Sequence, residues 1–129
     1  MEKDFKSWIR LKEKLDNIAT QVLFKEREIW WCALGCNVGQ EANGKNEQFI
    51  RPILVFKKLT LNSFVGLPLT TKVKEGSWYV PISQRGRASR VMINQIRIFD
   101  SKRLYNKIGA LDFNDWTKVK QRFKDFYCA

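Results

Sequence analysis

Between residues 28 and 82 the sequence contains four short runs that are rich in aromatic and branched residues. Runs of this length and composition are typical of β-strands, and the glycine and asparagine residues between them are typical of turns. A further strand is expected at residues 90–94, leading into residues 96–99. Strands this short and this closely spaced favour a small, strongly bent sheet or a barrel. The four runs are residues 28–34 (EIWWCAL), 50–58 (IRPILVFKK), 63–69 (SFVGLPL) and 77–82 (SWYVPI).

Helices are expected before and after these strands. Residues 3–22 place apolar side chains at three- and four-residue spacing, which predicts an amphipathic helix. Asp100 is expected to cap a short helix over residues 101–108, and residues 112–126 repeat the amphipathic pattern. The expected fold class is therefore α+β and mainly β, with 129 residues in one domain. In that domain residues 1–24 form an N-terminal helical extension, 28–111 the core and 112–126 a C-terminal helix.

The charge of the chain indicates a polyanionic partner. Lys and Arg total 24 against 13 Asp and Glu, a formal net charge of +11. Nucleic acid is the first candidate partner, and an anionic membrane surface or an acidic protein the second. No window approaches the run of about 20 apolar residues that spans a bilayer. The charged N-terminal segment lacks the apolar stretch of a signal peptide, so we expect a cytoplasmic protein without membrane attachment.

The chain has no histidine, which restricts the chemistry available to it. A Ser-His or Cys-His nucleophile is excluded, as is RNA cleavage by a pair of histidines. Catalysis would have to use carboxylate, guanidinium and hydroxyl groups. Three cysteines, Cys32, Cys36 and Cys128, are an odd number that fits a reducing compartment. Two of them four residues apart, without histidine, do not predict a zinc site, so no metal or cofactor is expected.

Four segments, taken in order, resemble the MazF/PemK toxins of bacterial toxin–antitoxin pairs over about residues 28–111. The resemblance implies a compact SH3-like barrel, a homodimer and an acidic antitoxin as protein partner. Two features depart from the family pattern: the loop over residues 39–51 is long, and a helix precedes the first strand. The segments are residues 28–31 (EIWW) with 38–41 (VGQE), 51–55 (RPILV), 66–70 (GLPLT), and 91–100 (VMINQIRIFD) running into 102–104 (KRL) and 108–109 (IG).

The resemblance also implies a metal-independent endoribonuclease that cuts single-stranded mRNA, with 2′,3′-cyclic phosphate and 5′-hydroxyl ends. Arg51 is the first candidate, because its fork of donors suits two phosphate oxygens. Thr70 supplies a hydroxyl for the scissile phosphate, and the register of the strand favours it over Thr71. Glu41 is the carboxylate that would accept the 2′ proton or order Arg51 through an ion pair.

Basic loops are expected to hold the RNA strand. An exposed Trp78 or Tyr79 would stack a base, whereas Trp30, Trp31 and Phe56 are interpreted as core or dimer contacts. The basic residues expected to track phosphates are Lys72, Lys74, Arg85, Arg87 and Arg90.

Two other functions remain open from the sequence. One is a non-catalytic inhibitor of gyrase or another essential enzyme, like toxins that share the barrel architecture. Those act through an aromatic-Gly-Ile tail, whereas this sequence ends Phe126-Tyr127-Cys128-Ala129. The other is a nucleic-acid-binding module without chemistry, which requires Arg51 and Thr70 to lie apart in space.

Overall fold

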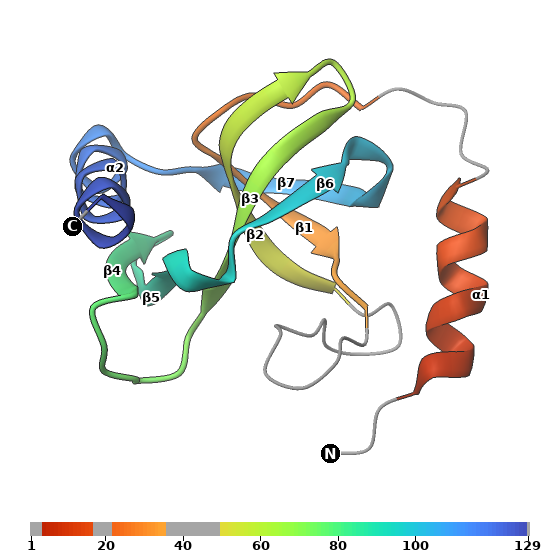
Figure 1. The fold of residues 1–129 in the computed structure, drawn as a ribbon, viewed down its shortest axis with the longest axis horizontal. Coiled ribbons are helices and arrows are strands. Elements are labelled where there is room, and N and C mark those ends of the chain that lie inside the picture. The colour runs from red at the N-terminus through yellow and green to blue at the C-terminus, as the bar shows by residue number, and fades with distance from the viewer. Residues whose placement is uncertain (1–3, 17–21, 36–49, 129) are drawn as a thin grey trace.

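The computed structural model describes residues 4–16, 22–35 and 50–128, and it consists of a curled sheet with one helix on each side (Figure 1). Short 3-10 turns, η1 and η2, flank the sixth strand. The elements in chain order are α1 (Phe5–Asp16), β1 (Glu28–Ala33), β2 (Ile50–Thr60), β3 (Ser63–Thr70), β4 (Tyr79–Gln84), β5 (Arg87–Met92), η1 (Ile93–Gln95), β6 (Arg97–Asp100), η2 (Ser101–Arg103), β7 (Leu104–Ala110) and α2 (Phe113–Tyr127).

The seven strands form an antiparallel sheet in the order β4-β5-β3-β2-β1-β7, with β6 paired to β3 off this path. The sheet bends so far that its two ends approach each other. Arg85, in the turn between β4 and β5, donates a hydrogen bond to the backbone carbonyl of Ile108 on β7. Among the described residues no ladder joins β4 to β7, so the barrel is curled but open. The expected mainly-β fold with a helix at each end is confirmed.

The central strands are buried on both faces over most of β1 and β3 and in the middle of β2, which explains why these parts of the sequence read as continuous apolar runs. On β2, Leu54 belongs to the cluster inside the curl, whereas its neighbours Ile53 and Val55 belong to a second cluster on the opposite face. All three side chains are fully buried. Successive side chains of a strand point to opposite faces, so a strand covered on both sides must be apolar throughout.

The prediction of a helix at residues 101–108 is wrong. Only η2 (Ser101–Arg103) turns there, and the chain continues as β7, which pairs with β1 through Cys32 and Leu104. Leu104 and Ile108 have the four-residue spacing of a helix, but backbone bonding to the edge of β1 decides the structure. The expected capping role of Asp100 is correct, since its Oδ1 accepts from the backbone N–H of Lys102 at 2.8 Å.

Helix α1 (Phe5–Asp16) lies within the segment expected to be helical and is fixed to the sheet by Trp8; residues 17–21 of that segment lie outside the described residues. Trp8 is buried with Leu15 and with Ala33 of β1. Gly35 follows β1 with a φ of +78°, and a Cβ atom there would lie 2.1 Å from the indole of Trp8. Only glycine tolerates both the backbone angle and this approach. The close contact between Gly35 and Trp8 therefore fixes α1 against the end of β1.

Helix α2 covers β4, an edge strand of the sheet. Asp112 caps the helix by accepting from the backbone N–H of Asp115 at 2.7 Å. The carboxylate of Asp115 accepts from the backbone N–H of Ser83 at 3.0 Å, and Arg122 donates to the carbonyl of Tyr79 at 3.4 Å. The strand's outward backbone groups are thus bonded to helix side chains.

No helix within the described ranges is both long enough and apolar enough to cross a membrane.

Candidate functional site

A pocket with a volume of about 300 Å³ lies where the ends of β1, β2 and β3 meet those of β4 and β5. It brings together two residues that the sequence analysis proposed as catalytic, Arg51 and Thr70. Its lining combines one cation, several hydroxyl and amide groups and an indole. The lining residues are Trp31, Ile50, Arg51, Pro52, Leu69, Thr70, Thr71, Gln84 and Ser89.

Arg51 lies near the start of β2, opposite Cys32 of β1. Its side chain is half-buried, and its Nη1 donates to the backbone carbonyl of Leu69 on β3 at 3.0 Å. This bond ties the guanidinium to the strand that carries Thr70. Burial lowers the pKa of Arg51 below its usual range, yet an arginine remains charged at neutral pH. The pocket therefore holds a positioned, partly desolvated cation.

Thr70 is the last residue of β3 and is 6% exposed. Its backbone is held by β5, where it pairs with Arg90, and its carbonyl accepts from the hydroxyl of Ser89 at 3.1 Å. The Thr70 hydroxyl accepts from the backbone N–H of Lys72 at 3.2 Å. Because that bond uses the oxygen as acceptor, the hydroxyl proton is available to a ligand in the pocket. Thr71, the alternative candidate, is exposed and lines the same pocket.

Trp31 is a pocket residue that the sequence analysis missed. Its expected place in the core is wrong, because it is 37% exposed and lines the pocket opposite Pro52. The dimer contact, the other expectation for Trp31, stays a prediction. Its neighbour Trp30 is 8% exposed and packs in the core, as expected. Alternation along β1 puts the two indoles on opposite faces. The sequence shows that Trp30 and Trp31 lie on opposite faces of β1. It does not show which of the two faces is exposed to solvent.

Two of the expected RNA-binding cations lie next to Thr70. Lys72 is exposed just beyond the end of β3, and Nη1 of Arg90 donates to its carbonyl at 3.4 Å. Arg85 and Arg87 are exposed at the turn between β4 and β5, which begins at the pocket residue Gln84. Each of these four positions is next to a pocket residue in the sequence or in strand pairing, and we call them the basic rim.

Two other expected RNA-binding residues lie elsewhere. Trp78 precedes the first residue of β4, whereas the pocket residue Gln84 ends that strand. Six strand residues separate their positions by about 20 Å. Lys74 is exposed in the segment between β3 and β4 and does not line the pocket. Glu41, the expected carboxylate, falls outside the described residues.

In the described ranges no three Cys, Asp or Glu side chains lie close enough together to hold a metal ion. Cys32 is fully buried, and burial raises the pKa of its thiol to about 12, while the charges of Arg103 and Arg97 act in the opposite direction. A thiol held protonated in this way is a poor ligand and a poor nucleophile.

Comparison with known proteins identifies relatives of this arrangement. A family model described as PemK-like, MazF-like toxin of type II toxin–antitoxin system matches residues 25–127, which leaves α1 outside the match. No curated protein sequence matches the chain. Among solved structures, MazF of Deinococcus radiodurans superposes with a TM-score of 0.67 at 16% identity, covering 84% of this chain and 99% of that one.

Two mycobacterial structures are also similar. The Mycobacterium tuberculosis toxin MazF-mt6 has a TM-score of 0.61 at 17% identity, over 79% of this chain and 97% of that one. An endoribonuclease solved in complex with its cognate antitoxin, from a mycobacterial species, has a TM-score of 0.61 at 15% identity. That match covers 78% of this chain and 90% of the other. At these identities the likeness is one of fold.

Proposed function

The chain belongs to the PemK-like, MazF-like toxins of type II toxin–antitoxin systems, and on this premise we propose that it is a metal-independent endoribonuclease that cleaves single-stranded RNA at short sequence motifs. An acidic antitoxin that covers the basic rim of the pocket is the proposed protein partner, and the proposed working unit is a homodimer. The mycobacterial endoribonuclease with a bound antitoxin supports this pairing of activity and partner.

The proposed reaction uses the substrate's own 2′-hydroxyl as nucleophile. Its oxygen attacks the adjacent phosphorus and loses its proton, the bond from phosphorus to the 5′ oxygen breaks, and that oxygen takes up a proton. The products are a 2′,3′-cyclic phosphate and a 5′-hydroxyl end. The protein must align the strand and stabilise the extra negative charge on the phosphorane.

Arg51 and Thr70 are the groups proposed for that work. The guanidinium of Arg51 offers donors in a fixed plane to two phosphate oxygens and remains charged. The hydroxyl of Thr70 donates to a third position on the phosphate. Glu41 is proposed to receive the 2′ proton or to order Arg51. Trp31 would stack a base beside the scissile bond, and the basic rim of Lys72, Arg85, Arg87 and Arg90 would follow the strand. Beyond the pocket, Lys74 would contact a further phosphate and Trp78 would stack a more distant base.

One observation carries the proposal: Arg51 and Thr70 line one pocket, held together by the hydrogen bond from Arg51 to Leu69. A binding module without chemistry would need these residues apart, so this arrangement argues against it. A gyrase inhibitor does not require a half-buried arginine beside a threonine hydroxyl, and no feature of the pocket favours that function.

The test is to incubate the purified protein with long single-stranded RNA in excess EDTA and to map the new ends. Cuts at a short recurring motif with cyclic-phosphate ends, reduced in both Arg51→Ala and Thr70→Ala, are expected. A folded dimer that cuts none of several diverse RNAs would refute the proposal and favour an enzyme inhibitor. Cleavage that survives in Arg51→Ala would keep the activity and refute this active site.

A further inference from the structure

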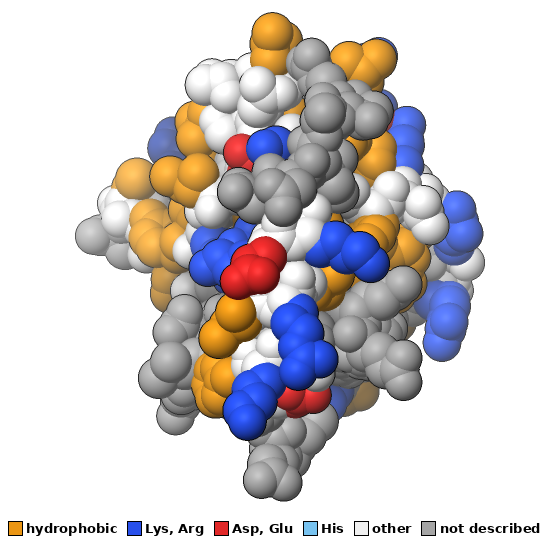
Figure 2. Space-filling model, turned by 90° about the vertical axis from the view of Figure 1, so that its right-hand side faces the viewer, with side chains coloured by type: hydrophobic (Ala, Val, Ile, Leu, Met, Phe, Trp, Pro, Cys, Tyr) orange, Lys and Arg blue, Asp and Glu red, His pale blue; other side chains and the backbone are white. Residues whose placement is uncertain are grey.

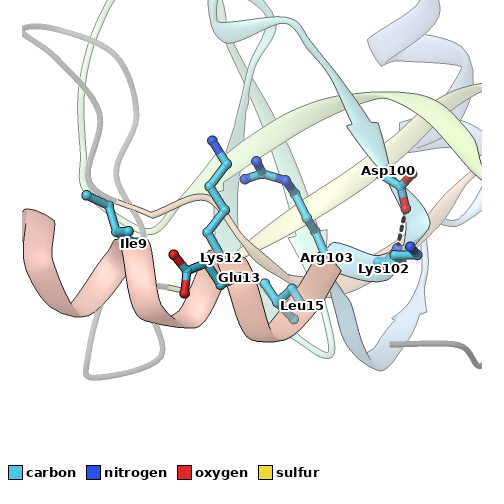
Figure 3. Close-up of a pocket in the computed structure, with 7 residues that line it drawn as sticks. All are labelled: Ile9, Lys12, Glu13, Leu15, Asp100, Lys102 and Arg103. Carbon is cyan, nitrogen blue, oxygen red and sulfur yellow. Dashed lines mark hydrogen bonds between the residues drawn. The ribbon is translucent and has the colours of Figure 1, made fainter. Parts of the chain in front are cut away.

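A second hollow, with a volume of about 350 Å³, lies between α1 and η2 (Figure 3). We call it the α1–η2 groove. Its apolar part is formed by Ile9 and Leu15 of the helix. Its charged lining comes from both walls: Lys12 and Glu13 from α1, and Asp100, Lys102 and Arg103 from the other side. One wall is α1, which lies outside the residues that match the toxin family, so the family match does not account for the groove.

The groove is built on fixed elements. Helix α1 is anchored by the buried Trp8, and the guanidinium of Arg103 lies over the Trp8 ring at 5.3 Å from its centroid. Nη1 of Arg103 also donates to the carbonyl of Ala33 at 3.1 Å. Stacking and hydrogen bonding hold this guanidinium in one orientation, so a ligand would lose little further freedom of the side chain on binding.

The lining of the groove carries three cations and two carboxylates. In Figure 3 the amino group of Lys12 and the guanidinium of Arg103 extend in the same direction, whereas the carboxylate of Glu13 points away from Arg103. Asp100 is engaged in capping η2. Burial, and then the nearby charge of Arg97, lower the pKa of Arg103, while Cys32 and the carboxylate of Asp100 act in the opposite direction. Within the described residues neither Lys12 nor Arg103 forms an ion pair with a carboxylate.

The face of the molecule that carries α1 holds further cations. Figure 2 shows the face that carries α1, where Lys and Arg side chains gather with a few acidic groups among them. Like charges crowded on a partly desolvated surface repel one another, and a bound anion relieves that repulsion. The favoured ligand is therefore an anion that accepts several hydrogen bonds, as a phosphate does.

The groove lies close to the Arg51–Thr70 pocket. Cys32 of β1 pairs with Arg51 on one side and with Leu104, the residue after Arg103, on the other. Two strand spacings put the backbones of Arg51 and Leu104 about 10 Å apart. This backbone separation is shorter than a nucleic-acid strand a few nucleotides long.

We propose that the α1–η2 groove binds a backbone phosphate of the RNA strand that occupies the Arg51–Thr70 pocket, so that α1 extends the substrate-binding surface. Lys12 and Arg103 hold the phosphate from opposite walls, and Ile9 and Leu15 contact the adjoining nucleoside. The inference rests on the proposed ribonuclease function for the identity of the strand.

The test measures binding without cleavage. The probe is a fluorescent 2′-O-methyl oligouridine of about 16 nucleotides, long enough to cover both sites and lacking the 2′-hydroxyl nucleophile. Its Kd is determined by anisotropy over a range of salt concentrations for the full-length protein and for Lys12→Ala, Lys12→Glu and Lys12→Arg. Lys12 is exposed, so these variants are expected to fold. The matched control is Lys14→Ala, on the same helix but outside the groove lining.

Loss of one phosphate contact in Lys12→Ala should raise the Kd about threefold to tenfold and reduce the slope of log K against log salt by about 0.7. Lys12→Glu should weaken binding further, Lys12→Arg should restore it, and Lys14→Ala should change the slope less. An unchanged slope in Lys12→Glu, or equal losses in Lys12→Ala and Lys14→Ala, would overturn the proposal. So would weakened binding of an Asp- and Glu-rich peptide with no effect on the oligonucleotide, which would assign the groove to a protein.

These outcomes are separate from the proposed catalysis. If the protein cuts no RNA but binds the oligonucleotide through Lys12, the proposal for the groove is supported and the ribonuclease function is refuted. If the protein cuts RNA and Lys12→Glu leaves KM unchanged, the ribonuclease function is supported and the proposal for the groove is refuted.

Discussion

Arg51 and Thr70 reach one pocket from adjacent strands, because Nη1 of Arg51 donates to the carbonyl of Leu69, the residue immediately before Thr70, at 3.0 Å. The two side chains are 19 positions apart in the sequence, yet strand pairing and this hydrogen bond bring them together before any substrate arrives. In the proposed reaction this reduces the reorganisation needed when negative charge develops on the phosphorane.

The first prediction concerns the shape of the cation at position 51. Arg51→Lys keeps the charge but loses the planar pair of donors, so kcat for RNA cleavage should fall about 10²- to 10³-fold. In Arg51→Ala the kcat should fall by at least the same factor. Both variants release the Leu69 carbonyl, which should cost about 1 kcal/mol of unfolding free energy, measurable by urea titration. A lysine variant with wild-type kcat would show that charge alone suffices.

The second prediction decides between two neighbouring hydroxyls. Thr70→Val is close to isosteric in a buried position and removes only the hydroxyl, so cleavage should fall roughly 10²-fold. Thr70→Ser should keep most of the activity. Thr71→Val is the control, because Thr71 lines the same pocket but is exposed. Single-turnover rates give the comparison, and a larger loss in Thr71→Val would move the catalytic hydroxyl by one residue.

The third prediction separates two exposed indoles. Trp31 is 37% exposed in the pocket and Trp78 is 36% exposed at the far end of β4. If Trp31 stacks a base beside the scissile bond, Trp31→Ala should raise KM about 5- to 150-fold, and Trp31→Phe should recover much of the loss. Trp78→Ala should change KM much less for a short RNA substrate. The opposite ranking of the two alanine variants would remove Trp31 from the site.

The fourth prediction concerns pH and stability through Glu28. Burial alone would raise the pKa of this carboxyl, but hydrogen bonds from Lys107, from the backbone of Lys25 and from the Trp30 indole lower it below 4.5. The Lys107 contact is 2.7 Å long. A lowered folded-state pKa means that the stabilisation is present above the usual carboxyl range and is lost as the pH falls through the folded-state value.

Glu28→Gln should therefore cost about 1–2 kcal/mol of unfolding free energy at neutral pH, and the difference from wild type should shrink as the pH falls below about 4. Urea unfolding of wild type and Glu28→Gln, followed by tryptophan fluorescence at neutral pH and below about pH 4, tests this prediction. A difference that stays constant with pH would mean that the carboxylate's charge does not contribute to stability.

Much of the fold could be read from the sequence because its central strands are buried on both faces. The runs expected at residues 28–34 and 63–69 correspond to β1 (Glu28–Ala33) and β3 (Ser63–Thr70). The C-terminal helix expected at 112–126 is α2. The error at residues 101–108 has a different origin, because β7 is defined by its pairing with β1, about 75 residues earlier in the chain, and local spacing carries no such information.

The site was predictable only in part. Arg51 and Thr70 were identified through the family pattern, and the structure places both in one pocket. The exposure of Trp31 was not predictable, because periodicity assigns a residue to a face of a strand without saying what covers that face. The groove beside α1 was also out of reach, since it depends on how Trp8 fits against Gly35.

The cover that α2 provides for β4 has a consequence for the behaviour of the chain at high concentration. An uncovered edge strand is a template for pairing with another chain, and repeated pairing leads to aggregation. Alternate residues of β4 face outward: Tyr79 and Ser83 are bonded to Arg122 and Asp115, and between them Pro81 has no N–H to offer. Polymerisation through this edge is thus blocked at three successive positions, and loss of α2 would leave proline as the last barrier to it.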